Sequence, residues 1–395
     1  MSSQQLANRV KALQSSAIRD LLKHSKMEGV ISLGGGIPNP DLFDTEGLEL
    51  AMERVMTTER HNAFQYGLSE GDPALRAAIC QILVERGIQS TIDDVMVTSG
   101  SQQSLDILAR AVINPGDTIV VERPTYLAAL QVFQLAEAQL ASVGTDGEGM
   151  IVDELAELVQ KQKIKAVYIV PTFGNPSGVT LSAARRQQLV ALAQQHGFLI
   201  FEDDPYSEIN FSSEKFRTLK SYAQEMGASD QVIYTSTFSK ILAPGARVGW
   251  IVSPSWLKQS VVNLKQSTDL HTSSLSQSLT RHYLETGRLQ SQIALISKEY
   301  KKKCDALCVA MESELGDRIR FHRPLGGMFL WATFKEPFNT TEWLKTTLQN
   351  GVVYVPGEFF YCDNPDQSTL RLSYASVSEE NLLKAAQRLK ASLPK

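Results

Sequence analysis

The sequence of 395 residues has few cysteines and no long apolar run. Its four cysteines, Cys80, Cys304, Cys308 and Cys362, show neither CxxC spacing nor the density of a secreted disulfide scaffold, so we expect free, buried thiols. No run of about 18 apolar residues occurs, and the N-terminal "MSSQQLANRVKALQSSAIRDLLK" has no apolar signal core. These absences predict a cytoplasmic protein that does not span a membrane.

An excess of charge of either sign is also missing. The 39 basic and 43 acidic residues give a formal net charge of −4, which gives no indication of a nucleic-acid or anionic-membrane partner. The six histidines fit no HExxH or paired-ligand spacing. Cys304 and Cys308 lie one helical turn apart and could hold a metal, but no second Cys/His pair stands at ligand spacing. We expect no metal site.

Short apolar runs alternate with helix-like stretches, which is typical of an α/β protein with a mainly parallel sheet. Strands are expected within residues 94–100, 117–126, 164–178, 198–206, 231–240 and 247–252, and helices over 101–113 and 182–197. Most of these strands end in polar residues. Because open α/β sheets bind ligands at the carboxyl ends of their strands, the polar ends indicate a ligand site.

The two ends of the chain differ from this middle part. Residues 1–45 combine a helix-like segment with the loop "SLGGGIPNPDLF", whose glycines and prolines favour close backbone approach over regular structure. Residues 296–395 contain a helical run and the strand-like "GGMFLWATF" and "TLRLSYAS". We predict a large domain over residues 46–295 and a small α+β domain built from both termini.

Lys240 ends the apolar run "QVIYTSTFSK". A desolvated lysine has a lowered pKa and offers a neutral amine that can form an imine, although a lone lysine in this position can also be a surface residue. The hydroxyls of Thr237 and Ser239 and the guanidinium of Arg247 resemble a pocket for a phosphate dianion. In "TSGSQQ", a turn at Gly100 would direct the first amides of a helix toward the same anion.

A phosphate beside an imine-forming lysine suggests pyridoxal phosphate, whose ring nitrogen needs an acidic partner. "FEDDPY" offers Asp203, with Tyr206 three residues later for the 3′-oxygen, although three consecutive acids are also typical of a solvated turn. Asn175 in "FGNPSG" could donate to the same oxygen, although Asn-Pro is also a common turn former.

In combination, "SGSQQ", "RPTY", "NPSG", "EDDPY", "TFSK" with an arginine seven residues later, and "RLSYA" resemble the class I aminotransferases of fold type I. "GGGIPNP" and "SAIRDL" are similar to the branch that contains the 2-aminoadipate and kynurenine aminotransferases. The resemblance covers essentially the whole chain. It implies pyridoxal 5′-phosphate as cofactor, a mainly parallel seven-stranded sheet, and a homodimer with active sites at the subunit interface.

The resemblance also implies roles for the residues of the cofactor site. Lys240 is the lysine that binds the cofactor and moves the substrate proton, Asp203 pairs with the ring nitrogen, and Tyr126 stacks on the ring. Asn175 and Tyr206 hold the 3′-oxygen. The phosphate is held by Ser101, Gln102, Thr237, Ser239 and Arg247, and by Tyr66 from across the dimer. Thr237 departs from the serine that relatives often carry, but the hydroxyl remains.

On the substrate side, the resemblance makes Arg371 in "TLRLSYA" the clamp for the α-carboxylate, where a strand arginine facing solvent is the alternative. Asn175 and Gly36 line the substrate site. Arg19 in "AIRD" is similar to an arginine that contacts a distal substrate carboxylate.

The predicted function is transfer of the amino group of an L-amino acid to a 2-oxo acid such as 2-oxoglutarate, in a ping-pong cycle. A β-lyase or decarboxylase uses the same lysine and electron sink, and is the alternative. A DNA-binding regulator with an aminotransferase-like domain would need a basic helix-turn-helix before that domain, and residues 1–45 already match the family's own N-terminal segment. The sequence leaves open which donor is used: 2-aminoadipate, aromatic, branched-chain, methionine and glutamate-type donors all fit.

Overall fold

The central element of the fold is an eight-stranded sheet. The computed structural model describes residues 6–11 and 27–394. In spatial order the strands of this sheet are β2 (Val95–Thr98), β9 (Gly249–Val252), β8 (Val232–Thr237), β7 (Leu199–Asp203), β6 (Ala166–Ile169), β3 (Thr118–Arg123), β4 (Gln139–Asp146) and β5 (Gly149–Met150). The predicted mainly parallel sheet is confirmed. Beyond the seven strands expected, the two-residue β5 adds an eighth at one edge.

Strand direction brings the polar strand ends together. Strands β8, β7, β6, β3 and β4 run parallel in that order, whereas β9 is antiparallel to both β8 and β2, and β5 is antiparallel to β4. The carboxyl ends of β6, β7 and β8 therefore lie side by side, and the segments that follow them carry Asn175, Tyr206 and Lys240. This is the edge at which the sequence predicted the ligand site.

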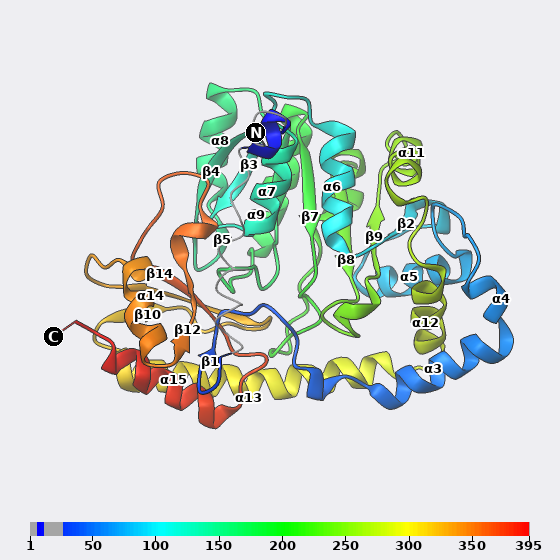
Figure 1. The fold of residues 1–395 in the computed structure, drawn as a ribbon. Coiled ribbons are helices and arrows are strands. Elements are labelled where there is room, and N and C mark those ends of the chain that lie inside the picture. Colours follow the sequence, from blue (N-terminus) through cyan, green and yellow to red (C-terminus); the bar gives the residue numbers. More distant parts are fainter. Residues whose placement is uncertain (1–5, 12–26, 395) are drawn as a thin grey trace.

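Helices cover both faces of the sheet (Figure 1). Alternate residues of β3 show the two faces: Ile119 and Val121 join a core cluster with Leu108 of α6, and Val120 joins a second cluster with Leu189 of α9. The helices in this part of the chain are α5 (Pro73–Glu85), α6 (Ser101–Val112), α7 (Leu127–Leu135), α8 (Val152–Lys161), α9 (Ala183–His196), α10 (Leu219–Glu225), α11 (Lys258–Asp269) and α12 (Ser274–Glu285).

A second, smaller sheet is built from the C-terminal part of the chain. Its order is β10 (Ile319–Phe321), β11 (Phe329–Phe334), β14 (Thr369–Ser373) and β13 (Val355–Pro356), all antiparallel. Separately, β1 (Ile31–Ser32) pairs in parallel with β12 (Val352–Val353), which ties an N-terminal segment to the C-terminal part of the chain.

The long helix α13 (Leu289–Leu315) runs along the base of the molecule in Figure 1, in contact with α15 (Glu379–Ala391). The other α-helices of the described residues are α1 (Asn8–Lys11), α3 (Thr45–Thr58), α4 (Arg60–Ala63) and α14 (Thr340–Gln349). Helix α13 continues through residue 295, where we predicted the boundary between the two domains. The division into domains therefore stays a prediction.

Within the described ranges, every helix is too short or too polar to cross a bilayer. The four cysteines are free, and only Cys362 is more than slightly exposed. Among residues 6–11 and 27–394, no three His, Cys, Asp or Glu side chains are grouped to hold a metal ion.

Candidate active site

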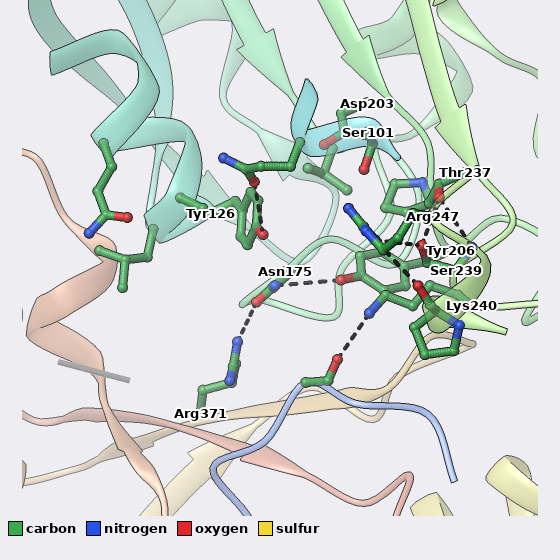
Figure 2. A pocket seen from close by; sticks show the side chains of 18 residues that line it. Ser101, Tyr126, Asn175, Asp203, Tyr206, Thr237, Ser239, Lys240, Arg247 and Arg371 are labelled. Atoms are coloured by element: carbon green, nitrogen blue, oxygen red, sulfur yellow. Dashed lines mark hydrogen bonds between the residues drawn. The ribbon is translucent and has the colours of Figure 1, made fainter. Parts of the chain in front are cut away.

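A cavity of about 330 Å³ opens at the carboxyl ends of β6, β7 and β8, between the large sheet and the smaller one (Figure 2). Twelve of the fourteen residues that the sequence predicted for the site line it. They are Gly36, Ser101, Gln102, Tyr126, Asn175, Asp203, Tyr206, Thr237, Ser239, Lys240, Arg247 and Arg371. The fold thus assembles in one place residues that are as far apart in sequence as Gly36 and Arg371.

Lys240 lies in the turn after β8, three residues beyond the last strand residue. Its Nζ donates a hydrogen bond to the backbone oxygen of Gly36 at 3.0 Å (Figure 2). Burial, together with the positive charges of Arg371 and Arg247, lowers the pKa of Lys240 to about 8. A substantial share of this amine is therefore neutral near physiological pH, as imine chemistry requires.

The predicted phosphate site is a ring of donors around the start of α6. Thr237 Oγ1 and Ser239 Oγ lie 2.9 Å apart, and Arg247 Nη1 reaches Ser239 Oγ at 3.5 Å. Arg247 Nη2 is held by the backbone oxygen of Ser99 at 2.9 Å. Gly100 precedes the helix with φ of +86°, and a Cβ there would stand 2.6 Å from Arg247 Nη2. Only glycine leaves this space open, which fits a cradle for an anion at a helix N-terminus.

The three consecutive acids at the end of β7, Glu202, Asp203 and Asp204, lie in three different environments. Glu202 accepts backbone hydrogen bonds from Leu219 at 2.7 Å and Lys220 at 2.8 Å, at the N-terminus of α10. Asp204 accepts a hydrogen bond from the Tyr234 hydroxyl at 2.8 Å. Of the three, only Asp203 lines the cavity. The alternative of a solvated acidic turn is excluded, because all three are at most 4% exposed.

Asp203 is buried, and one of its carboxylate oxygens is unsatisfied. Oδ2 accepts a hydrogen bond from the Tyr168 hydroxyl at 2.9 Å, whereas Oδ1 has no partner among the described residues. Burial raises the pKa of Asp203 to about 7. A buried acceptor without a partner is costly, so this oxygen fits a donor that the cofactor would bring.

Asn175 connects the two halves of the cavity. Its Nδ2 reaches the Tyr206 hydroxyl at 3.5 Å, and its Oδ1 accepts a hydrogen bond from Arg371 Nη1 at 2.8 Å (Figure 2). Burial raises the pKa of the Tyr206 phenol well above its ordinary value. The bond to Asn175 acts against that rise. One amide thus contacts both the Tyr206 phenol, which follows β7, and the Arg371 guanidinium of β14.

Arg371 is a buried strand residue of β14, so the alternative of a solvent-facing arginine is wrong. Its Nη2 donates to the Gly34 backbone oxygen at 2.7 Å, and its guanidinium carbon lies 4.3 Å from the Phe329 ring centre and 5.0 Å from that of Phe360. Burial lowers the pKa of Arg371 to about 10, so it stays charged at neutral pH. Nε has no partner among the described residues. The group is held in place yet free to receive a carboxylate.

Tyr126 is the residue immediately before α7. Its hydroxyl lies 3.5 Å from Gln102 Oε1, and burial raises its pKa to about 12, so the phenol is neutral at physiological pH. The ring and the Gln102 amide both line the cavity. This placement fits a ring that stacks on a flat ligand beside its phosphate.

The two remaining predicted residues are Tyr66 and Arg19. Tyr66 is 77% exposed and makes an edge contact with the His271 ring, with the ring centres 5.7 Å apart. It does not line the pocket of its own chain. Arg19 lies outside the described residues, so its role stays a prediction.

Sequence reasoning missed several residues around the site. Tyr168 is hidden in the apolar run "AVYIV", and Phe329 and Phe360 look like ordinary core aromatics. Leu127, Ala128 and Gln131 of α7 line the cavity beyond Tyr126. A signal existed for Tyr168 alone: it lies in the expected strand within residues 164–178, which precedes in sequence the expected strand that carries Asp203.

Comparisons with known proteins agree with this geometry. Residues 30–389 match the family "Aminotransferase class I and II". Aromatic-amino-acid aminotransferase 1 of Thermococcus litoralis is 42% identical over 383 residues, 95% of this chain and 91% of that protein. The 2-aminoadipate transaminase of Thermus thermophilus is 32% identical, over 96% and 94% of the two chains. A crystal structure of Pyrococcus horikoshii kynurenine aminotransferase with PMP superposes with a TM-score of 0.93 at 38% identity, covering 98% and 96%.

The fold and the buried lysine define a fold type I α/β enzyme. The chain belongs to the class I and II aminotransferase family, and it is a pyridoxal-phosphate-dependent aminotransferase. The residues fit this cofactor. The unsatisfied Asp203 oxygen could accept a hydrogen bond from a protonated ring nitrogen, and the space that Gly100 leaves beside Arg247 could hold the phosphate. The comparisons do not favour the β-lyase or decarboxylase alternative.

Proposed function

We propose that the enzyme transfers the amino group of an L-amino acid with an uncharged or carboxylate side chain to a 2-oxo acid such as 2-oxoglutarate, with the residue roles given below. The observation that carries the proposal is that Lys240, Asp203 and Arg371 line one cavity, where Gly36 binds the Lys240 amine and Asn175 binds the Arg371 guanidinium. A lysine amine, a ring-nitrogen partner and a carboxylate clamp are the groups that amino transfer needs.

When bound, the cofactor supplies an electron sink that acidifies the substrate Cα–H. Asp203 is placed to hold the ring nitrogen protonated, and Tyr126 to cover the ring. Asn175 and Tyr206 would hold the 3′-oxygen. The phosphate would be bound by the donors around the start of α6, which are Ser101, Gln102, Thr237, Ser239 and Arg247.

On the substrate side, Arg371 binds the α-carboxylate with paired N–H donors and so fixes the orientation of Cα. As a neutral amine, Lys240 would take the Cα proton and deliver it to the cofactor's C4′ within the same half-reaction, and in the second half it would move a proton from C4′ back to Cα. Its lowered pKa of about 8 suits this exchange, because a general base works best when its pKa lies near the working pH.

The residues that line the cavity limit which amino acids can serve as amino donors. The cationic lining residues in the described part of the chain are Lys240, Arg247 and Arg371, and each already has a role. The side-chain wall from α7 consists of Leu127, Ala128 and Gln131, which suits aromatic and aliphatic donors. The distal carboxylate of a donor such as 2-aminoadipate would be bound by Arg19. The names of the relatives, aromatic, 2-aminoadipate and kynurenine aminotransferases, support this range.

A single-turnover experiment tests the reaction. The loaded enzyme is mixed with one amino acid and no acceptor, and we expect one equivalent of 2-oxo acid and of pyridoxamine phosphate per site, followed by a stop. Adding 2-oxoglutarate should restart turnover. Continuing release of ammonia or CO₂ without an acceptor would instead establish the lyase or decarboxylase. A panel of aromatic, aliphatic and dicarboxylic donors, run in the same way, identifies the donor.

We further propose a homodimer in which Tyr66 of one subunit serves the phosphate bound in the other. The motivation is that Tyr66 is exposed on its own chain, with exposed Phe64 and Leu68 beside it in sequence, although the family resemblance assigns it to the cofactor phosphate. Tyr66→Phe should weaken cofactor binding, and Lys240→Ala should be inactive. A heterodimer of the two variants contains one fully native site, so refolded mixtures should exceed the mean activity of the parents.

The control is each variant refolded alone at the same total concentration. Native mass spectrometry shows whether heterodimers form. If they form and the mixture only averages its parents, Tyr66 does not act across the interface.

A further inference from the structure

Tyr168 and Asp203 form a buried pair behind the cavity. Tyr168 belongs to β6 and Asp203 to the adjacent parallel strand β7. The Tyr168 hydroxyl donates to Asp203 Oδ2 at 2.9 Å, and the two residues are 0% and 4% exposed. Because both backbones are held in one hydrogen-bonded sheet, this contact is fixed by the core and does not depend on a mobile loop.

The contact makes the two oxygens of Asp203 unequal. Oδ2 is occupied by Tyr168, and Oδ1 has no partner in the described part of the chain although Asp203 lines the cavity. We propose that Tyr168 is a positioning residue, whose hydroxyl fixes the rotation of the Asp203 carboxylate and so presents Oδ1 to the cofactor ring nitrogen. This rests on the proposed role of Asp203.

The charges around Asp203 give Tyr168 a second effect. Burial raises the pKa of Asp203, the Tyr168 bond lowers it, the neighbouring charge of Asp204 raises it and Lys240 lowers it. Tyr126 and Tyr206 also face Asp203, but both phenols are neutral at physiological pH. Without the Tyr168 hydroxyl the carboxylate becomes more basic. A proton shared with the ring nitrogen then moves toward Asp203.

The chain offers a matched control in Tyr234 of β8. Its hydroxyl donates to Asp204 Oδ2 at 2.8 Å, and Tyr234 is 0% exposed. Tyr168→Phe and Tyr234→Phe therefore each remove one phenol from one buried carboxylate of the same acidic run. They differ in that Asp203 lines the cavity and Asp204 does not, and in that the Tyr234 hydroxyl also accepts a hydrogen bond from Arg86 Nη1 at 2.6 Å. A general loss of stability should therefore be at least as large in Tyr234→Phe as in Tyr168→Phe.

The test uses apoprotein of both variants, of Asp203→Asn and of the parent, reconstituted with pyridoxal phosphate labelled with ¹⁵N in the ring. In Tyr168→Phe we expect the ring ¹⁵N resonance to move toward the value of an unprotonated nitrogen. We also expect kcat to fall roughly tenfold to hundredfold for all donors with little change in KM, the range for a lost hydrogen bond to a charged group. Tyr234→Phe should keep the parent resonance and kcat.

Each outcome has a distinct reading. If Asp203→Asn shifts the resonance and Tyr168→Phe does not, the inference about Tyr168 is wrong while the role of Asp203 stands. If neither variant shifts it, the proposed role of Asp203 is itself wrong. Equal shifts in Tyr168→Phe and Tyr234→Phe would show a general effect of loosening the sheet. Thermal melting of all four proteins at the same loading shows whether each is folded.

Discussion

Lys240→Ala is expected to abolish amino transfer while the variant still binds pyridoxal phosphate non-covalently through the phosphate cradle. The proposal gives Lys240 two tasks, the covalent bond to the cofactor and transfer of the Cα proton, so its loss should lower kcat by about 10⁴-fold or more. Borohydride reduction of the parent enzyme followed by peptide mapping checks the assignment. The pyridoxyl label should fall on Lys240 and should be absent from the variant.

Lys220 is the built-in control for this experiment. Burial lowers the pKa of Lys220 to about 8, the same value as for Lys240, but its Nζ is bonded to the backbone oxygens of Ser229 and Val232, both at 2.8 Å, outside the cavity. A label on Lys220 would show that basicity alone selects the lysine, and would contradict the assignment.

The rate of covalent attachment should also depend on pH. Below pH 8 the Lys240 amine is mostly protonated and cannot attack, and above pH 8 it is mostly neutral. Attachment to the apoprotein should therefore accelerate as the pH rises through about 8 and then level off.

Asp203→Asn is expected to lower kcat by about 10³-fold, on the scale of losing one charge-assisted contact to the reacting system. The amide keeps the shape of the side chain but cannot hold the ring nitrogen as a cation, so the electron sink weakens. Because the proposal assigns substrate binding to Arg371 and not to Asp203, KM should change much less than kcat. Steady-state kinetics with saturating cofactor measures both.

The two neighbouring acids are the controls. Glu202→Gln loosens the N-terminus of α10, and Asp204→Asn weakens the bond with Tyr234 and the 3.6 Å contact with Arg86. Each should reduce stability by about 1–3 kcal/mol, the cost of an impaired buried hydrogen bond, yet retain most of its kcat once folded and loaded. Equal losses of kcat in all three variants would mean that the acidic run has only a structural role.

Six strands of the large sheet could be predicted from sequence because they are short, mostly apolar runs that end in turn residues, whereas β4, "QLASVGTD", is mixed in polarity and was missed. "VIYTST" is buried at every position in the structure, as such a run predicts for a strand covered on both faces. The edge strand β5 could not be predicted. Gly149 and Met150 carry no strand pattern, and their pairing depends on the loop that folds back onto β4.

The same contrast holds within the site. Lys240, Asp203 and Arg371 stand out because charge is unexpected beside apolar runs, and the family resemblance gave their roles. Tyr168, Phe329 and Phe360 carry no such signal, since aromatic residues in strands are ordinary core. Their importance arises from contacts across strands: Phe329 and Phe360 meet Arg371 over about 40 and 10 residues of chain, and no local pattern records such contacts.

The surroundings of Arg371 have a practical consequence for handling the enzyme. Its partners among the described residues are an amide oxygen, a backbone oxygen and two aromatic rings, with no carboxylate among them, so the positive charge is oriented but not neutralised. An anion entering from solution meets no internal competitor for this charge. Acetate, citrate and other carboxylate buffers should therefore behave as competitive inhibitors, and assays or crystals prepared in them would describe an occupied site.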